Sequence, residues 1–176
     1  MGTFIEMEGD LLKLSLVVFF LVIAHGCNCF CTQLSGLAPQ MVKAFGTDKN
    51  FELEGGNFKG DINKLGQIDY CRYFKREDGS IFADPDCWHT GTPDLYVVNA
   101  YTQFNYGSNH ADGDTKPVDY EAITLCMRKI NHTFKGQHIG LPKIGAGLAG
   151  GDWNRIKSII QKELKDCNVT VVNYDK

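Results

Sequence analysis

Residues 139–153, which read IGLPKIGAGLAGGDW, constrain the fold more than any other stretch of the chain. A short apolar run ends in a loop with glycines at 145, 147, 150 and 151, and apolar residues then recur at helical spacing from Ile156 to Leu164. This pattern predicts a strand, a glycine-rich loop and a helix whose first turn carries Asp152. Such glycines expose backbone N–H groups. The loop is therefore either a phosphate cradle at a helix N-terminus or a tight turn without a ligand.

Two common phosphate-binding motifs do not fit this loop. No Gly-Lys-Ser/Thr sequence follows it, so it is not a Walker loop. It also lies near the end of the given sequence with no βαβ unit after it, which excludes the context of a dinucleotide-binding fingerprint.

Length and charge limit the class of protein. With 176 residues, 43% of them hydrophobic, residues 1–176 are expected to form one domain with a sizeable core. Lys and Arg number 18 against 21 Asp and Glu, a formal net charge of -3. This balance argues against general nucleic-acid binding. A small anionic ligand held by backbone amides remains compatible with it, and we expect a monomer that binds such a molecule.

The cysteines indicate a reducing compartment. Their number is seven, and no convincing secretory signal accompanies them, so free thiols and a cytoplasmic location (or the nucleus or a host cytoplasm) are expected. Cys27, Cys29 and Cys31 alternate with other residues, which is the spacing of a strand and not the C-x2-C of a zinc site. We therefore expect buried or loop-lining thiols and no metal.

The apolar run over residues 14–24 could be a membrane segment or a core strand. It is shorter than the roughly 20 residues that a spanning helix needs. The residues before it are more acidic than basic, unlike the start of a signal peptide. Its Val, Phe and Ile content is typical of a strand buried on both faces. The sequence predicts a strand over residues 16–24 of a soluble protein that has no membrane partner.

Strands and helices are predicted to alternate along the chain. Strands are expected at 3–7, 16–24, 67–74, 95–100, 139–144 and 169–174, and helices at 37–45, 120–130 and 152–165, with a turn at 76–79 and a loop over 80–92. Pro39 in the first turn and Gly46 after the last residue suit the first helix. This order predicts an α/β protein, a three-layer α/β/α sandwich whose ligand binds at the carboxyl ends of the strands.

Several short motifs together resemble the macro domain. Gly9-Asp10 follows the first strand, Asn28 follows the second, a small-residue loop opens a helix, and the glycine loop reads Gly145-x-Gly147-Leu148-x-Gly150-Gly151-x-Trp153. Members of that family bind ADP-ribose, and some remove it or a phosphate from it. The resemblance covers nearly the whole chain and implies a mixed central sheet with no cofactor. Within the family, the chain is similar to two groups: the ADP-ribose 1''-phosphate phosphatases of yeast and phage type, and the terminal ADP-ribose hydrolases that include antitoxin macro domains.

The resemblance assigns roles at the adenine and ribose ends of the ligand. Asp10 would accept a hydrogen bond from the adenine amino group, and the amide of Leu11 would support the ring. Asn28 would bind the distal ribose, and Tyr174 would flank the adenine. From the residues alone, Asp10 could equally be a helix cap or a turn residue, and Tyr174 a core aromatic.

Two loops would hold the diphosphate, and one departs from the family pattern. Residues 32–36 contain a single glycine, which restricts backbone approach there. Gln103 stands where the similar hydrolases carry a catalytic lysine, and glutamine cannot form a Schiff base. This difference favours the phosphatase group. The remaining binding residues implied by the resemblance are Ser35, Gly36, Gln103, Gly145, Ala146, Gly147, Leu148, Ala149 and Gly150.

Asp152 and His25 are the candidate catalytic residues. Asp152 could position or deprotonate a water, or it could simply cap the last helix. His25 could protonate a leaving sugar oxygen, or it could be a satisfied, half-buried polar residue. His110 could reach the distal ribose or be a mobile surface histidine, and Asp112 and Asp114 beside it raise a metal interpretation that no other ligand spacing supports.

Three functions follow. The first is hydrolysis of ADP-ribose 1''-phosphate to ADP-ribose. The second is removal of ADP-ribose from protein or nucleic acid, with Asp152 activating the sugar in place of the missing lysine. The third is a non-catalytic reader of ADP-ribose. The glutamine at position 103 counts against the second function, and the pair His25 and Asp152 counts against the third.

Overall fold

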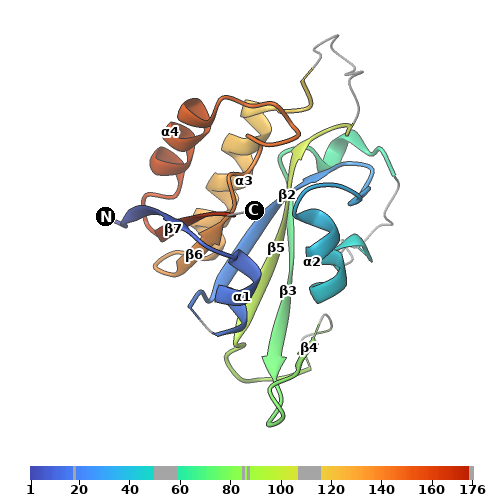
Figure 1. Ribbon diagram of the computed structural model, residues 1–176, viewed down its shortest axis with the longest axis vertical. Helices are drawn as coiled ribbons and strands as arrows, with labels where there is room; N and C mark the ends of the chain where they lie inside the picture. Colours follow the sequence, from blue (N-terminus) through green and yellow to red (C-terminus); the bar gives the residue numbers. More distant parts are fainter. Residues whose placement is uncertain (18, 50–58, 85, 87, 107–115, 175–176) are drawn as a thin grey trace.

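Helices cover both faces of one sheet in the computed structural model, which describes residues 1–17, 19–49, 59–84, 86, 88–106 and 116–174 (Figure 1). The helices are α1 (Leu11–Leu16), α2 (Ala38–Phe45), α3 (Tyr120–Thr133) and α4 (Trp153–Glu163), with 3-10 turns at Thr47–Lys49 and Ile62–Lys64. The strands are β1 (Phe4–Glu8), β2 (Val22–Asn28), β3 (Ile68–Lys75), β4 (Ile81–Ala83), β5 (Leu95–Gln103), β6 (His138–Leu141) and β7 (Asn168–Asn173). The predicted α/β/α sandwich is confirmed.

The sheet is mixed, as the resemblance implied. Its order is β1-β7-β6-β2-β5-β3-β4. From β1 to β5 in that order every pair is parallel, whereas β3 is antiparallel to both β5 and β4. Parallel neighbours need crossover connections, and the helices in those connections cover the two faces.

Each face of the sheet has its own apolar core. On one side α3 and α4 pack against the sheet, and on the other α1 and α2 do so (Figure 1). Alternate residues of β2 serve the two cores, because successive side chains of a strand point to opposite faces. Val22 and Ala24 face α3 and α4, whereas Ile23 belongs to the core under α2. The strand is thus buried on both faces, as its composition predicted.

The strand predicted over residues 16–24 is wrong in its first half. The Asp10 carboxylate accepts hydrogen bonds from the N–H groups of Leu12 (3.0 Å) and Lys13 (3.2 Å), which starts α1 at Leu11, ahead of the apolar run, and the helix extends into the run as far as Leu16. The run is therefore divided among a short helix, a connection and a strand that begins at Val22. No helix within the described ranges is long and apolar enough to cross a bilayer.

The other predicted elements differ from the observed ones by at most three residues at either end. One strand was missed. Residues 80–92 were predicted as loop, but Ile81–Ala83 pairs with β3 as an edge strand. Three residues are too few to show an alternating pattern.

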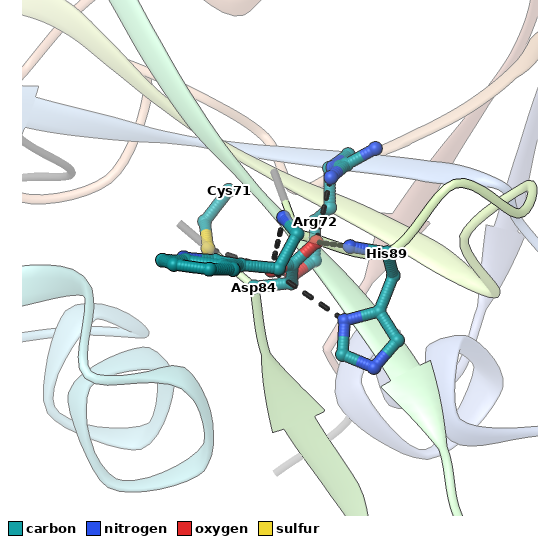
Figure 2. A network of polar contacts seen from close by, with 5 residues as sticks. Cys71, Arg72, Asp84 and His89 are labelled. Atoms are coloured by element: carbon teal, nitrogen blue, oxygen red, sulfur yellow. Dashed lines mark hydrogen bonds and ion pairs between the residues drawn. The ribbon is translucent and has the colours of Figure 1, made fainter. Parts of the chain in front are cut away.

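A polar cluster fixes the chain that follows this edge strand (Figure 2). The buried Asp84 carboxylate accepts hydrogen bonds from the Arg72 guanidinium (2.6 Å) and from the N–H groups of Trp88 (3.0 Å) and His89 (3.2 Å). Burial alone would raise the pKa of Asp84, but these hydrogen bonds hold it below its ordinary value. Cys71 donates its S–H to the Arg72 carbonyl (3.5 Å). The cluster lies at the end of the sheet where β5 begins.

Phe20 is expected to be a main support of the connection between α1 and β2. It is fully buried, and its ring lies where a side chain at Gly140 would otherwise stand. Phe20→Ala should lower the free energy of unfolding by about 3–5 kcal/mol, measured by urea denaturation. Phe19→Ala is the matched control, because that neighbouring ring is 46% exposed. Equal losses in the two variants would contradict this account of the core.

Candidate functional site

A crevice opens where the chain leaves two neighbouring strands toward opposite faces. β2 and β6 are adjacent and parallel. The chain after β2 leads to α2 on one face, whereas the chain after β6 leads to α4 on the other. Ligands of α/β proteins bind in such a crevice at the carboxyl ends of the strands. The sheet topology therefore places the candidate site where the sequence predicted it.

A cavity of about 550 Å³ occupies this crevice. That volume suits a small-molecule ligand. Nine of the residues predicted to bind the ligand or act in catalysis line it: His25, Asn28, Ser35, Gly36, Gln103, Gly145, Gly147, Leu148 and Ala149. The structure thus brings together the end of β2, the loop before α2, the end of β5 and the glycine loop.

Six other predicted residues do not line the cavity: Asp10, Leu11, Ala146, Gly150, Asp152 and Tyr174. Asp10 is the cap of α1, the side chain of Leu11 is core, and Tyr174 is 58% exposed. Asp10 and Tyr174 nevertheless follow the carboxyl ends of β1 and β7, which are parallel to β6. They lie along the same edge of the sheet as the cavity, so their predicted adenine contacts remain predictions.

Asp152 is the N-cap of α4. Its carboxylate accepts hydrogen bonds from the N–H groups of Asn154 (2.8 Å) and Arg155 (3.4 Å). Its own N–H donates to the Tyr120 hydroxyl (2.9 Å). The geometry therefore corresponds to the helix cap considered for this residue, and it does not place the carboxylate on the cavity wall. The predicted role of His110 lies outside the described residues.

The glycines of the loop serve different needs. Gly145 and Gly150 have left-handed φ values of 74° and 72°, which disfavour side chains. A side chain at Gly151 would stand 2.6 Å from the Gly145 carbonyl oxygen. Gly147 has neither constraint: its φ lies outside the left-handed region, and a Cβ atom there would have no atom of the described residues within 4 Å. The fold requires three of these glycines and leaves Gly147 to the cavity.

Both loops present backbone N–H groups that the described protein does not use. In the glycine loop, Ala146, Gly150 and Gly151 donate to carbonyls within the loop. No partner among the described residues accepts from the N–H groups of the other loop residues that line the cavity: Gly145, Gly147, Leu148 and Ala149. The same holds before α2 for the N–H groups of Leu34, Ser35 and Gly36. Grouped free N–H groups favour an anionic ligand.

Asn28 shapes the first loop. Its Oδ1 accepts hydrogen bonds from the N–H groups of Phe30 (3.1 Å) and Thr32 (3.2 Å), and its Nδ2 donates to the Thr32 carbonyl (2.7 Å). The side chain is buried and engaged by backbone groups, so a bond to a ribose would have to share these atoms. β2 ends here, so Cys29 and Cys31 lie in the loop that follows, and Cys29 is buried, which agrees with the expected buried or loop-lining thiols.

His25 lies in the cavity wall beside a buried amide. Its Nε2 is 2.7 Å from Oδ1 of Asn99, which is fully buried on β5. Burial lowers the pKa of His25 to about 4, although the hydrogen bond with Asn99 raises it. The imidazole is therefore neutral at physiological pH. A neutral ring has no extra proton to donate at the start of a reaction, but it can accept a proton and donate it in a later step.

Asp69 continues this polar row across the sheet. Asn99 is paired with His25 on one side and with Asp69 on the other. The Tyr101 hydroxyl donates to Asp69 Oδ2 (2.6 Å), while Asp69 Oδ1 is buried without a partner among the described residues. Burial raises the pKa of Asp69 to about 6, against the hydrogen bonds from Tyr101 and Asn99 that lower it.

Sequence reasoning missed some of the residues that matter at this site. Lys143 lines the cavity and carries the only formal charge among the described lining residues. Its signal was its position two residues before Gly145. Asn99 and Asp69 could not be found, because they lie inside apolar strands whose pairing the sequence does not reveal. Gln33 and Thr47 are joined to Asn99 and Cys27 by hydrogen bonds from different parts of the chain.

Asp69→Asn should change the pH dependence of stability in a defined direction. The folded carboxyl, with a pKa of about 6 against the ordinary 3.8, binds more protons than the unfolded one between those values. Wild-type stability from this group therefore falls as pH rises through 6. Urea denaturation should show the variant gaining on the wild type by up to about 3 kcal/mol between pH 4 and pH 7.

Asp78→Asn is the control for this measurement. Hydrogen bonds from Ser80 lower the pKa of this exposed carboxyl, so the difference between variant and wild type should run the opposite way with pH. A gain of the same sign in both variants would disprove the assignment to Asp69.

Comparison with known proteins identifies the relatives of the chain. No protein-family profile matches it. It is 32% identical over 159 residues to an uncharacterised 17.5 kDa protein from the tk-vs intergenic region of enterobacteria phage T4, a match that covers 87% of this chain and 86% of the phage protein.

Solved structures that are similar over at least 98% of the chain include the following three. A protein of unknown function from Bacteroides thetaiotaomicron has 21% identity, a TM-score of 0.66 and 98% of its chain covered. Thermosipho africanus DarTG in complex with ADP-ribose has 16% identity, a TM-score of 0.64 and 42% of its chain covered. The macrodomain of Thermus aquaticus DarG has 18% identity, a TM-score of 0.60 and all of its chain covered. The chain therefore belongs to the family of the phage T4 17.5 kDa protein and has the macrodomain fold.

Proposed function

We propose that the cavity binds ADP-ribose, with the diphosphate held by backbone N–H groups of the two loops. The observation that carries this proposal is Gly147, a cavity-lining glycine that the fold itself does not require, set among free N–H groups. Such groups bind phosphate without any lysine, which agrees with a net charge of -3. Similarity to a structure solved in complex with ADP-ribose supports the choice of ligand.

We propose further that the chain hydrolyses ADP-ribose 1''-phosphate. A water oxygen would attack phosphorus while the bond from phosphorus to the sugar oxygen breaks. His25, neutral and on the cavity wall, would take the proton from the water, and that proton would then pass to the departing sugar oxygen. The products are ADP-ribose and inorganic phosphate. Lys143 would favour the negative charge of the substrate.

A non-catalytic reader is the second candidate. It is favoured by one observation: none of the described residues that line the cavity is an aspartate or a glutamate. Incubation with ADP-ribose 1''-phosphate, with ADP-ribosylated protein and with ADP-ribosylated DNA separates the functions. Release of inorganic phosphate supports the phosphatase, and release of ADP-ribose from the polymers supports a hydrolase of that class. Binding in calorimetry without any product supports the reader.

Gly147→Val should abolish ADP-ribose binding in calorimetry, because the valine would fill the cavity mouth beside the free N–H groups. The thermal unfolding midpoint should stay close to that of the wild type, since a Cβ atom at this position has no atom of the described residues within 4 Å. Gly91→Val is the matched control: this glycine is equally open and lies outside the cavity lining. Wild-type affinity in Gly147→Val would show that the loop is only a turn.

Asp152→Asn should retain phosphate release, because the Asp152 side chain caps α4 in this structure. Asparagine caps helices about as well as aspartate, and the Asp152 carboxylate does not line the cavity. The steady-state rate with ADP-ribose 1''-phosphate measures this directly. A loss of about 10²-fold or more, with the fold intact, would instead restore the general-base role inferred from the sequence.

A further inference from the structure

We propose that Asn99 is a positioning residue, which holds His25 in the tautomer protonated at Nε2 and leaves the Nδ1 lone pair for a ligand in the cavity. The catalytic consequence rests on the proposed phosphatase function, but the assignment of the tautomer does not. It follows from which way the Asn99 amide must point.

The orientation of the Asn99 amide is set by a partner that can only accept a hydrogen bond. Its nitrogen is 3.1 Å from the carbonyl oxygen of Thr47, and a carbonyl can only accept. The amide nitrogen therefore faces Thr47 and the amide oxygen faces His25. Asn99 is fully buried, so no water competes for either end. The orientation of this amide is thus fixed by the backbone of the turn that follows α2.

Gln33 locks Thr47 in place. The Thr47 hydroxyl donates to Gln33 Oε1 (2.7 Å), and Gln33 Nε2 donates to the same Thr47 carbonyl (3.0 Å). Both residues are buried. Gln33 also lines the cavity, so this bond pair ties the first loop of the site to the amide behind His25.

The orientation of the amide decides the protonation of His25. The Asn99 oxygen can only accept, and it lies 2.7 Å from Nε2. Nε2 must therefore carry the proton, and in the neutral imidazole Nδ1 is then the acceptor. The Cys27 sulfur lies 4.0 Å from Nδ1 and 3.6 Å from Nε2, and among the described residues no other hydrogen-bond partner of Nδ1 is found. Burial raises the pKa of Cys27 well above its ordinary range, so this thiol stays neutral and does not compete for the ring proton.

The charges around this arrangement are consistent with a neutral ring. Asn99 stands between Asp69 on β3 and the imidazole, and Cys27 on β2 lies beside the ring. Tyr101 and Lys64 are further neighbours that act on Asp69, and Cys31 and Cys126 lie near Cys27. An amide at position 99 transmits no proton and adds no charge. A carboxylate there would place a negative charge against Nε2–H and raise the pKa of His25.

Nitrogen NMR of the intact protein tests the tautomer without any substrate. Long-range proton–nitrogen spectra at neutral pH should show His25 protonated at Nε2 and unprotonated at Nδ1. Asn99→Leu should give a mixture of tautomers or the reverse one. Asn131→Leu is the matched control, because that amide is also hydrogen-bonded, to Asp166, but lies away from the cavity. A wild-type His25 protonated at Nδ1 would overturn the proposal even if no Asn99 variant folds.

Kinetics with ADP-ribose 1''-phosphate test the consequence. Asn99→Leu should lower kcat by about 10²-fold with little change in KM, since it removes the orientation of a base and no ligand contact. Asn99→Asp keeps an acceptor for Nε2–H, so it should retain the tautomer and move the acidic limb of the kcat profile up by about 1 pH unit or more. Unchanged kcat in Asn99→Leu, with the tautomer lost, would overturn the positioning role. If the wild type releases no phosphate, the proposed function fails while the NMR result still decides the role of Asn99.

Discussion

The site depends on the pairing of β2 with β6. These strands are parallel neighbours, and the chain segments that follow them go to opposite faces of the sheet. The crevice between them therefore results from the path of the backbone and not from particular side chains. The same pairing sets two helix-leading loops opposite each other, one before α2 and one before α4. All the free N–H groups described above belong to these two loops. The hydrogen-bond donors of the cavity therefore come mainly from the backbone, so the proposed anionic ligand would need few basic side chains in a chain of net charge -3.

Elements whose ends are set by neighbouring residues were predicted well from the sequence, and elements whose ends depend on other contacts were not. The helix over residues 37–45 was predicted because Pro39 and Gly46 act on adjacent residues only, and Gly46 indeed ends it in a left-handed conformation. The last three elements, β6, α4 and β7, were also predicted from local patterns. The strand over 16–24 failed because apolar content does not say how a run is divided. What divided it was a single side-chain cap from Asp10.

The site was predictable where it is made of backbone and poorly predictable where it is made of paired strands. The glycine loop can be recognised from its composition alone. The row of His25, Asn99 and Asp69 does not, because these residues are 74 and 30 positions apart and meet only through the register of three strands. Asn99 lies within the strand sequence LYVVNAYTQ, and no residue near it in the sequence indicates its partners. Asp152 is the opposite case: a cap and a base have the same sequence signal, and only the shape of the cavity separates them.

The buried row also shows how a sheet core can hold polar side chains without losing its packing. Burial of these side chains is partly compensated by hydrogen bonds: His25 shares one with Asn99, and Asp69 accepts one from the Tyr101 hydroxyl. Burial moves the two titratable ends in opposite directions, lowering the pKa of His25 and raising that of Asp69, since in both cases it disfavours the charged form. The amide between them has a fixed donor end and a fixed acceptor end and does not titrate. This arrangement holds the neutral imidazole of His25 in a defined orientation at the wall of the cavity.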